Sequence, residues 1–210
     1  MKIISMRSTG KLFFLFVLVL SLVLTAGCTG NPGASADEQK SQTAEEKDSG
    51  QDTGETDASE GLTSFQTKDI FGNDVNQEIF QDYKMTLVNV WGTFCGPCLD
   101  EMPYLGELQK EYEPRGVNIA GIVCDVQDEN FEILDDQIGL AREIVDSTGA
   151  GYLHMIVSID MIDPVMSNFD AIPASFFVDS NGNIISEFYI GSRSKDDWKA
   201  LIEENLSKIE

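Results

Sequence analysis

Trp91-Gly-Thr-Phe-Cys-Gly-Pro-Cys98 is the stretch of sequence that decides the fold. It follows the apolar run 85–90, which has the composition of a buried strand. Pro97 then opens a stretch with helical character that reaches Tyr112, and proline suits a first helical turn because its missing N–H is not needed there. A strand that delivers a Cys-x-x-Cys pair to the start of a helix is typical of redox proteins.

The two cysteines of this motif have different expected roles. Cys95 stands at the start of the helix, where unsatisfied N–H groups and the positive end of the helix dipole favour a thiolate. We therefore expect Cys95 to attack a partner disulfide and form a mixed disulfide. Cys98 lies one turn deeper and is expected to resolve that intermediate.

Two structural interpretations compete with redox chemistry at this motif. A zinc site needs a second pair of ligands, and the remaining candidates Cys124, His154 and Cys28 stand at no recognisable spacing. A purely structural disulfide would close a loop across only two residues, which gains little from loop-closure entropy. Redox chemistry is the better interpretation.

The first residues have the features of a secretory signal segment, predicted over 1–27. Three cations, Lys2, Arg7 and Lys11, precede an apolar stretch at 12–24 that is shorter than the ~20 residues of a membrane-spanning helix. The residues Leu24-Thr-Ala-Gly-Cys28 resemble a bacterial lipobox, which predicts lipidation of Cys28. The alternative is an ordinary signal with a chance cysteine.

Residues 28–61 predict a disordered acidic tether, and residues 62–210 a single folded domain. The tether has almost no large apolar side chains and therefore cannot bury enough surface to offset its ordering entropy. A flexible chain of this length spans on the order of 30 Å. The expected location is the extracytoplasmic face of the cell membrane, through the lipid anchor.

The net charge excludes some partners. The chain carries a formal charge of −22, and removal of the three cations of the signal segment takes it to −25. Nucleic acid and bare anionic membrane are therefore poor partners.

Periodicity and turn residues predict an α/β domain. The expected elements, in chain order, are a hairpin at 65–75, a short helix at 78–83, a strand at 86–91, a helix at 97–112, a strand at 117–126, a helix at 134–146, a strand at 154–159, a short helix at 160–169, strands at 175–178 and 184–189, and an amphipathic helix at 196–209. This order predicts a central sheet covered on both faces.

In its order of elements and its motifs, the chain resembles a known family, the TlpA/ResA-like extracytoplasmic disulfide reductases of thioredoxin fold. Trp91 with Cys95 and Cys98, followed by Glu101 and Pro103, matches the family pattern of Trp, Cys-x-x-Cys and Glu-x-Pro. The resemblance covers the whole predicted domain. It implies a thioredoxin-like three-layer sandwich, in which helices flank a central mixed β-sheet and a β-hairpin precedes it.

The resemblance extends to a second motif and carries implications for partner binding. Ile172-Pro173 matches the family's cis-proline loop, and the residues Asp179 to Asn183 match its hairpin. The Pro173 ring would lie against Cys95, and the backbone of Ile172 would pair with the partner chain as an added strand. Partner binding is accordingly assigned to Trp91, Phe94, Pro97, Ile172 and Pro173.

This chain departs from the family at two of these positions. Phe94 stands where many members have Trp, and Ile172 stands where Thr is frequent. Both departures are expected to tune the fit of partners and leave the fold unchanged.

Glu101 is the expected acid–base residue. Thioredoxins proper carry a buried Asp where this chain has Asn89, and Asn cannot accept a proton. Glu101 lies three residues after Cys98 on the same helix face, and burial would raise its pKa toward the working range. The competing interpretation is a solvated helix glutamate.

The resemblance implies a thiol–disulfide oxidoreductase that reduces protein disulfides outside the membrane. Its redox centre is the cysteine pair, with no further cofactor and no metal. Expected partners are apocytochrome c, an oxidised methionine sulfoxide reductase or another lipoprotein, with a membrane thiol carrier as electron donor. The alternatives are a copper chaperone that uses Cys95, Cys98 and His154, and a thiol peroxidase, whose usual cysteine motif this chain lacks.

Several remaining residues have plain interpretations. Cys124 ends an apolar run and is expected to act as a small hydrophobe, with a third redox thiol left open as the alternative. His154 is expected to be a satisfied core histidine. The methionines Met155, Met161 and Met166 are expected to pack in the core.

Overall fold

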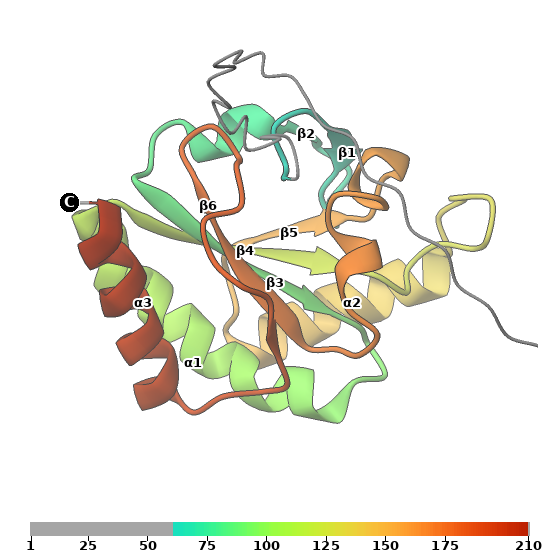
Figure 1. Ribbon diagram of the computed structural model, residues 1–210. Helices are drawn as coiled ribbons and strands as arrows, with labels where there is room; N and C mark the ends of the chain where they lie inside the picture. The colour runs from blue at the N-terminus through green and yellow to red at the C-terminus, as the bar shows by residue number, and fades with distance from the viewer. Residues whose placement is uncertain (1–60, 210) are drawn as a thin grey trace, which may run out of the picture. The chain divides into compact units, whose positions relative to one another are not determined.

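The computed structural model describes residues 61–209, which form a domain around a five-stranded mixed sheet (Figure 1). The strand order is β5-β4-β3-β6-β7. The strands are β3 (Met85–Trp91), β4 (Val117–Val123), β5 (Leu153–Ile156), β6 (Ala174–Asp179) and β7 (Tyr189–Ile190). The first three are parallel, and β6 and β7 run antiparallel to their neighbours.

The two central strands are apolar along their whole length because both faces of the sheet are covered. All seven residues of β3 and of β4 are buried. Continuous runs of this kind are characteristic of strands that lie inside a layered α/β domain. In register, Leu87 of β3 lies between Ile119 of β4 and Phe177 of β6.

Three helices pack against one face of the sheet. They are α1 (Gly96–Tyr112), α2 (Asp135–Thr148) and α3 (Lys195–Ile209), and their buried side chains share one apolar cluster with alternate residues of the strands (Figure 1). Helix α3 runs alongside α1 in the same direction, with Lys195 paired to Glu107 at 2.7 Å and Arg115 paired to Glu203.

The opposite face is covered by the N-terminal hairpin and by short 3-10 turns. The hairpin pairs β1 (Gln66–Lys68) with β2 (Asp74–Asn76), and turn η1 (Gln77–Phe80) follows it. These segments share a second apolar cluster with the other side of the strands. The predicted α/β fold with a mixed sheet and an N-terminal hairpin is thus confirmed, but no long helix lies in this layer among the residues described.

The segment predicted as a short helix at 160–169 forms two 3-10 turns instead. These are η3 (Ile159–Met161) and η4 (Met166–Asn168). Pro164 lies between them, and proline removes a helical N–H and disfavours the α conformation of the residue before it. The helical prediction was therefore wrong at this point.

The predicted strand at 184–189 is also mostly wrong. After a bridge between Val178 and Ile184, the chain makes regular pairing only at β7. The reason is local, because the hydroxyl of Ser186 accepts the N–H of Phe177 at 2.8 Å. That side chain takes the place of a backbone partner, so the ladder is interrupted.

The predicted signal segment, Cys28 and the tether up to residue 60 lie outside the described residues. None of the helices within 61–209 combines the length and hydropathy that crossing a membrane requires.

Candidate active site

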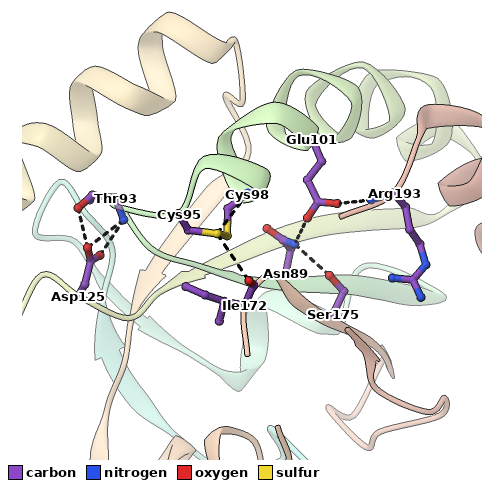
Figure 2. The surroundings of a disulfide bond; sticks show 9 residues. All are labelled: Asn89, Thr93, Cys95, Cys98, Glu101, Asp125, Ile172, Ser175 and Arg193. Atoms are coloured by element: carbon purple, nitrogen blue, oxygen red, sulfur yellow. Dashed lines mark hydrogen bonds between the residues drawn. A yellow bond between two sulfur atoms is a disulfide. The ribbon is translucent and has the colours of Figure 1, made fainter. Parts of the chain in front are cut away.

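Cys95 and Cys98 form a disulfide at the start of α1, directly after the carboxyl end of β3 (Figure 2). Their Cα atoms lie 5.2 Å apart. Cys95 is the N-cap of the helix, and its Sγ accepts the N–H of Cys98 at 3.2 Å. The predicted placement of the motif at a strand-to-helix junction is confirmed, and Pro97 stands in the first turn, where its ring is exposed.

The two sulfur-bearing residues differ in access. Cys95 is 6% exposed, whereas Cys98 has no exposed surface. A partner sulfur that approaches from solvent can therefore reach only Cys95 without movement of the chain. This geometry fits a first cysteine that attacks and a second that resolves.

The loop before β6 lies against the disulfide. The Ile172–Pro173 peptide bond is cis, as the sequence predicts, and the carbonyl oxygen of Ile172 lies 3.7 Å from Cys95 Sγ. Pro173 is buried and Ile172 is partly exposed. The two segments of the predicted site, far apart in the sequence, thus meet at the reactive sulfur (Figure 2).

Glu101 is buried beneath this junction, with only 1% of its surface exposed. One carboxylate oxygen accepts Asn89 Nδ2 at 2.9 Å, and the other accepts the backbone N–H of Arg193 and Trp198 Nε1, both at 3.0 Å. Burial raises the pKa of Glu101 above its ordinary value, although these hydrogen bonds to the anion act in the opposite direction. The interpretation as a solvated helix glutamate is wrong.

Asn89 connects Glu101 to the neighbouring strand. Its Nδ2 also contacts Ser175 Oγ at 2.9 Å, across the β3–β6 ladder where the two residues are direct partners (Figure 2). Within residues 61–209, Asn89 Oδ1 accepts no hydrogen bond. Neither Ser175 nor the hydrogen-bonding role of Trp198 was predicted from the sequence. A polar Ser within the apolar run 174–178 was the available signal for the first.

Trp91 does not belong to the exposed site, which corrects its assignment to partner binding. It has no exposed surface, and its Nε1 donates to His154 Nδ1 at 3.1 Å. His154 Nε2 then carries the ring proton and donates to the carbonyl of Ala150 at 2.8 Å. Burial lowers the pKa of His154 to about 4, so the ring is neutral. The prediction of a satisfied core histidine is confirmed.

Gly121 makes room for this pair of rings. A Cβ at that position would collide with His154 Nδ1 and would lie 3.1 Å from Trp91 Nε1. Trp91 is the last residue of β3, and the loop that carries Cys95 begins directly after it. Because the Trp91 ring is fixed in the core, it fixes the position at which this loop begins.

Asp125 fixes the loop between β3 and the disulfide, a role that was not predicted from the sequence. Its carboxylate accepts the backbone N–H of Thr93 at 2.9 Å and the Thr93 hydroxyl at 2.5 Å (Figure 2). The loop that carries Phe94 and Cys95 is thus tied to the end of β4.

Cys124 lies next to this contact but has the properties of a packing residue. It is partly buried, and burial together with the Asp125 carboxylate raises the pKa of its thiol to about 11. A thiol that stays protonated is a poor nucleophile. Met155 and Met161 are fully buried, as predicted. Within residues 61–209, no three His, Cys, Asp or Glu side chains gather in a way that could hold a metal ion.

Comparisons with known proteins agree with this site. Residues 57–202 match the sequence model of the Redoxin family. The chain is 25% identical to the thiol-disulfide oxidoreductase ResA of Bacillus thuringiensis (strain Al Hakam) over 194 residues, which cover 92% of this chain and 96% of the relative. It is 28% identical to ResA of B. thuringiensis subsp. konkukian over 204 residues, which cover 95% and 96%.

Solved structures share the fold. A thiol:disulfide interchange protein of the thioredoxin family from Chlorobium tepidum TLS superimposes with a TM-score of 0.57 at 25% identity, over 70% of this chain and 95% of that one. StoA from Bacillus subtilis superimposes with a TM-score of 0.51 at 17% identity, over 68% and 98%.

The match to the family covers more than half of the chain, and the relatives align over nearly their whole length. In this setting the Cys95–Cys98 disulfide is a redox centre. The chain belongs to the Redoxin family, in which it is a ResA/TlpA-like thiol–disulfide oxidoreductase.

Proposed function

We propose that this chain is a membrane-tethered reductase of disulfides in extracytoplasmic proteins. The charge around the motif is the observation that supports reduction, rather than oxidation, of the partner. Two carboxylates lie near the motif: Glu101 is buried on the same helix as Cys98, and Asp125 holds the backbone of Thr93 in the loop before Cys95. The alternative copper site lacks its third ligand, because both ring nitrogens of His154 are occupied within the core.

Negative charge near a cysteine pair favours the reducing direction. A disulfide is a strong oxidant when the protein stabilises the reduced, thiolate form of the couple. Carboxylates do the opposite, since a like charge raises the pKa of a thiol and destabilises its thiolate. The disulfide of this protein is therefore the favoured form, and its dithiol readily gives up electrons.

The proposed reaction has two exchange steps. The Cys95 thiolate attacks one sulfur of the partner disulfide, the partner S–S bond breaks, and a Cys95–partner disulfide forms. Cys98 then gives its proton to Glu101 and attacks Cys95 Sγ, so that the Cys95–partner bond breaks and the second partner sulfur leaves as a thiolate. The two partner thiolates take up protons from Glu101 and from water. The partner disulfide is reduced to a dithiol, while Cys95 and Cys98 are oxidised to the disulfide. An external thiol donor then restores the dithiol.

Glu101 is suited to accept that proton because burial raises its pKa more than its three N–H donors lower it. It lies three residues from Cys98, on the same helix α1. Its raised pKa brings a carboxylate closer to a thiol in basicity, which makes proton transfer less costly.

The tether is proposed from the sequence before residue 61. The lipobox-like residues up to Cys28 and the acidic segment after them would hold the domain on the extracytoplasmic face of the membrane. The ResA relatives align over 92% and 95% of this chain, so the similarity extends well ahead of the domain. Apocytochrome c and an oxidised methionine sulfoxide reductase are candidate partners, with a membrane thiol carrier as donor.

A Cys28→Ala variant tests the tether and the direction together. We expect it to leave the membrane fraction and stay folded, because the domain begins more than thirty residues later. Cells that produce either form are quenched with acid, and free thiols are labelled with a bulky maleimide. The wild-type chain should be found at the membrane with Cys95 and Cys98 reduced.

Two results would count against the proposal. A Cys28→Ala chain that stays with membranes after a high-salt wash would contradict the lipid anchor. A wild-type chain that is steadily oxidised, in cells with an intact thiol supply, would contradict a reductase.

A further inference from the structure

Three loops at the active-site edge of the sheet contain acidic residues and no cations. They are 92–101, 124–140 and 157–173, which follow β3, β4 and β5, and the first two include the opening turns of α1 and α2. These strands are parallel, so all three loops leave the sheet at the edge that carries Cys95. Together they hold eleven Asp and Glu residues, and no Lys, Arg or His.

Ten of these eleven residues lie at the surface, Glu101 being the buried exception. They are Asp100, Asp125, Asp128, Glu129, Glu132, Asp135, Asp136, Asp160, Asp163 and Asp170, which we name the acidic rim. None of them forms an ion pair with another residue in 61–209. Several of the domain's cations are instead paired with carboxylates elsewhere, as Lys195 and Lys199 are on the α1–α3 flank.

Local structure accounts for only part of the acidic rim. Asp125 and Asp128 accept backbone N–H groups, and two further members occupy the first turn of α2, where negative charge is favoured. The carboxylates of five members accept no hydrogen bond from any residue in 61–209: Asp100, Glu129, Glu132, Asp163 and Asp170. Arg193, after β7, is a cation beside Glu101, so this edge is predominantly rather than wholly negative. A field mainly of one sign around a reactive group attracts partners of the opposite charge.

An apolar patch lies inside the acidic rim, beside the reactive sulfur. Phe94 precedes Cys95 and is 75% exposed, the highest value of any large apolar side chain in 61–209. A Cβ on Gly92 would lie 3.0 Å from the Phe94 ring and 3.1 Å from Ile172 Cδ1. The two side chains therefore converge over Gly92, next to Cys95. An exposed aromatic ring in this position is a ready anchor for a partner side chain.

We infer that this surface selects polypeptide segments that present a disulfide beside an apolar side chain and among lysines and arginines. The inference rests on the proposed function, because it assumes that protein disulfides are the substrates. Attraction by the acidic rim would raise the rate of encounter, and the Phe94–Ile172 patch would hold the segment while Cys95 reacts. The exchange steps are those given above. The acidic rim and the Phe94–Ile172 patch only bind the segment, and take no part in the transfer of electrons or protons.

Matched cyclic peptides test the charge requirement. Each contains one intramolecular disulfide with Leu next to the attacked Cys, and its flanks carry lysines, serines or glutamates. The full chain is reduced, freed of reductant, and mixed with each peptide at about 10 mM and about 500 mM salt, a range over which the Debye length falls from ~30 Å to a few Å. We expect the lysine peptide to react about 10-fold or more faster than the glutamate peptide at low salt. That difference should nearly vanish at high salt.

Two triple variants then place the effect on the surface. Glu129→Gln/Glu132→Gln/Asp170→Asn removes three charges from the acidic rim, and should abolish most of the preference for lysine. Glu78→Gln/Asp82→Asn/Glu113→Gln removes three exposed charges near the opposite edge, where β3 begins, and should leave the preference intact. Equal losses in both variants would mean that only net charge matters, and would overturn the inference.

A second pair of variants tests the apolar anchor. Phe94→Ala should slow the reaction of a peptide with Leu next to its Cys about 10-fold, but should barely affect the same peptide with Gly there. Phe71→Ala is the matched control, because Phe71 is also exposed, at 65%, and lies in the β1–β2 turn. A Phe94→Ala variant that slows the Leu and Gly peptides alike would contradict a side-chain anchor.

The same rates measured from the oxidised protein and the reduced peptides separate this inference from the proposed function. If only this direction proceeds, the protein is an oxidant, yet the order of lysine, serine and glutamate peptides still tests the surface. Equal rates for all three peptides in the direction that proceeds would overturn the inference and leave the proposed function standing.

Discussion

A Cys98→Ser variant is expected to accumulate as mixed disulfides between Cys95 and partner proteins, and to lose catalytic turnover. The first exchange step needs only Cys95, the one cysteine of the pair with any exposed surface. The second step has no thiol in the variant. A positioned intramolecular group can act at an effective concentration of about 10⁵ M or more, which millimolar external thiol cannot replace.

Non-reducing gels followed by mass spectrometry measure this outcome. Adducts should disappear on addition of reductant, and should be absent from a Cys95→Ser/Cys98→Ser chain. A Cys98→Ser/Cys124→Ser chain should form adducts as readily as Cys98→Ser alone, because the raised pKa of the Cys124 thiol keeps it protonated. Adducts carried by Cys124 in place of Cys95 would overturn the assignment of the nucleophile.

A Glu101→Gln variant is expected to slow turnover between about 10- and 100-fold, below the upper end of the range for a fully rate-limiting proton transfer. Gln keeps the size of the side chain but cannot accept the proton of Cys98. The Gln amide can also be accommodated, because Asn89 Oδ1 lacks a donor among the residues described and can face the new N–H₂ group after rotation of its amide. We therefore expect the variant to fold.

The pH dependence separates a base from a structural residue. In the wild type, turnover should rise as Glu101 ionises, at a pH above the ordinary range of glutamate because its pKa is raised. This rising limb of the pH profile should be absent in Glu101→Gln. Alkylation of reduced Cys95 should be faster in the variant at the same pH, because loss of a neighbouring negative charge lowers the pKa of the thiol.

Trp198→Phe is the matched control, since it retains an aromatic ring but removes one N–H donor to the Glu101 carboxylate. Loss of this donor raises the pKa of Glu101 further, so the limb should move to higher pH and remain present. Superimposable pH profiles for the wild type and Glu101→Gln would show that Glu101 takes no proton, and that water must serve instead.

Stability gives an independent check with a fixed sign. A carboxyl group whose folded pKa is raised stabilises the fold below its unfolded pKa, and this contribution is lost as pH rises through the folded pKa. The free energy of unfolding of the wild type should therefore fall across that window relative to Glu101→Gln. Urea titrations at several pH values measure the difference.

The sequence predicts those parts of this molecule that depend on local patterns. The Cys-x-x-Cys pair, Pro97 in the first helical turn and the apolar run of β3 are neighbours in the chain, so their joint structure follows from short-range rules. The Ile172–Pro173 loop is predicted from its resemblance to a family, and its cis bond is confirmed.

The features that the sequence does not predict depend on which strands and helices come into contact in the folded domain. Glu101 is held by Asn89, Arg193 and Trp198, from three separate elements, and only the packed fold places their donors around one carboxylate. Trp91 was assigned to partner binding from its place in the motif, but its ring is buried in the core, in space that is open because Gly121 has no side chain. Such outcomes are set by register and by side-chain volume, which a one-dimensional pattern does not contain.

The reduction potential of the Cys95–Cys98 couple tests the central claim, that this oxidoreductase acts as a reductant. Equilibration of the purified chain against glutathione or dithiothreitol buffers, followed by alkylation of free thiols, gives the potential directly. Since carboxylates destabilise the thiolate form, we expect a value near that of thioredoxin, about −270 mV. A value near about −120 mV, where the reduced form is strongly stabilised, would contradict the account and assign the protein to the oxidation of thiols.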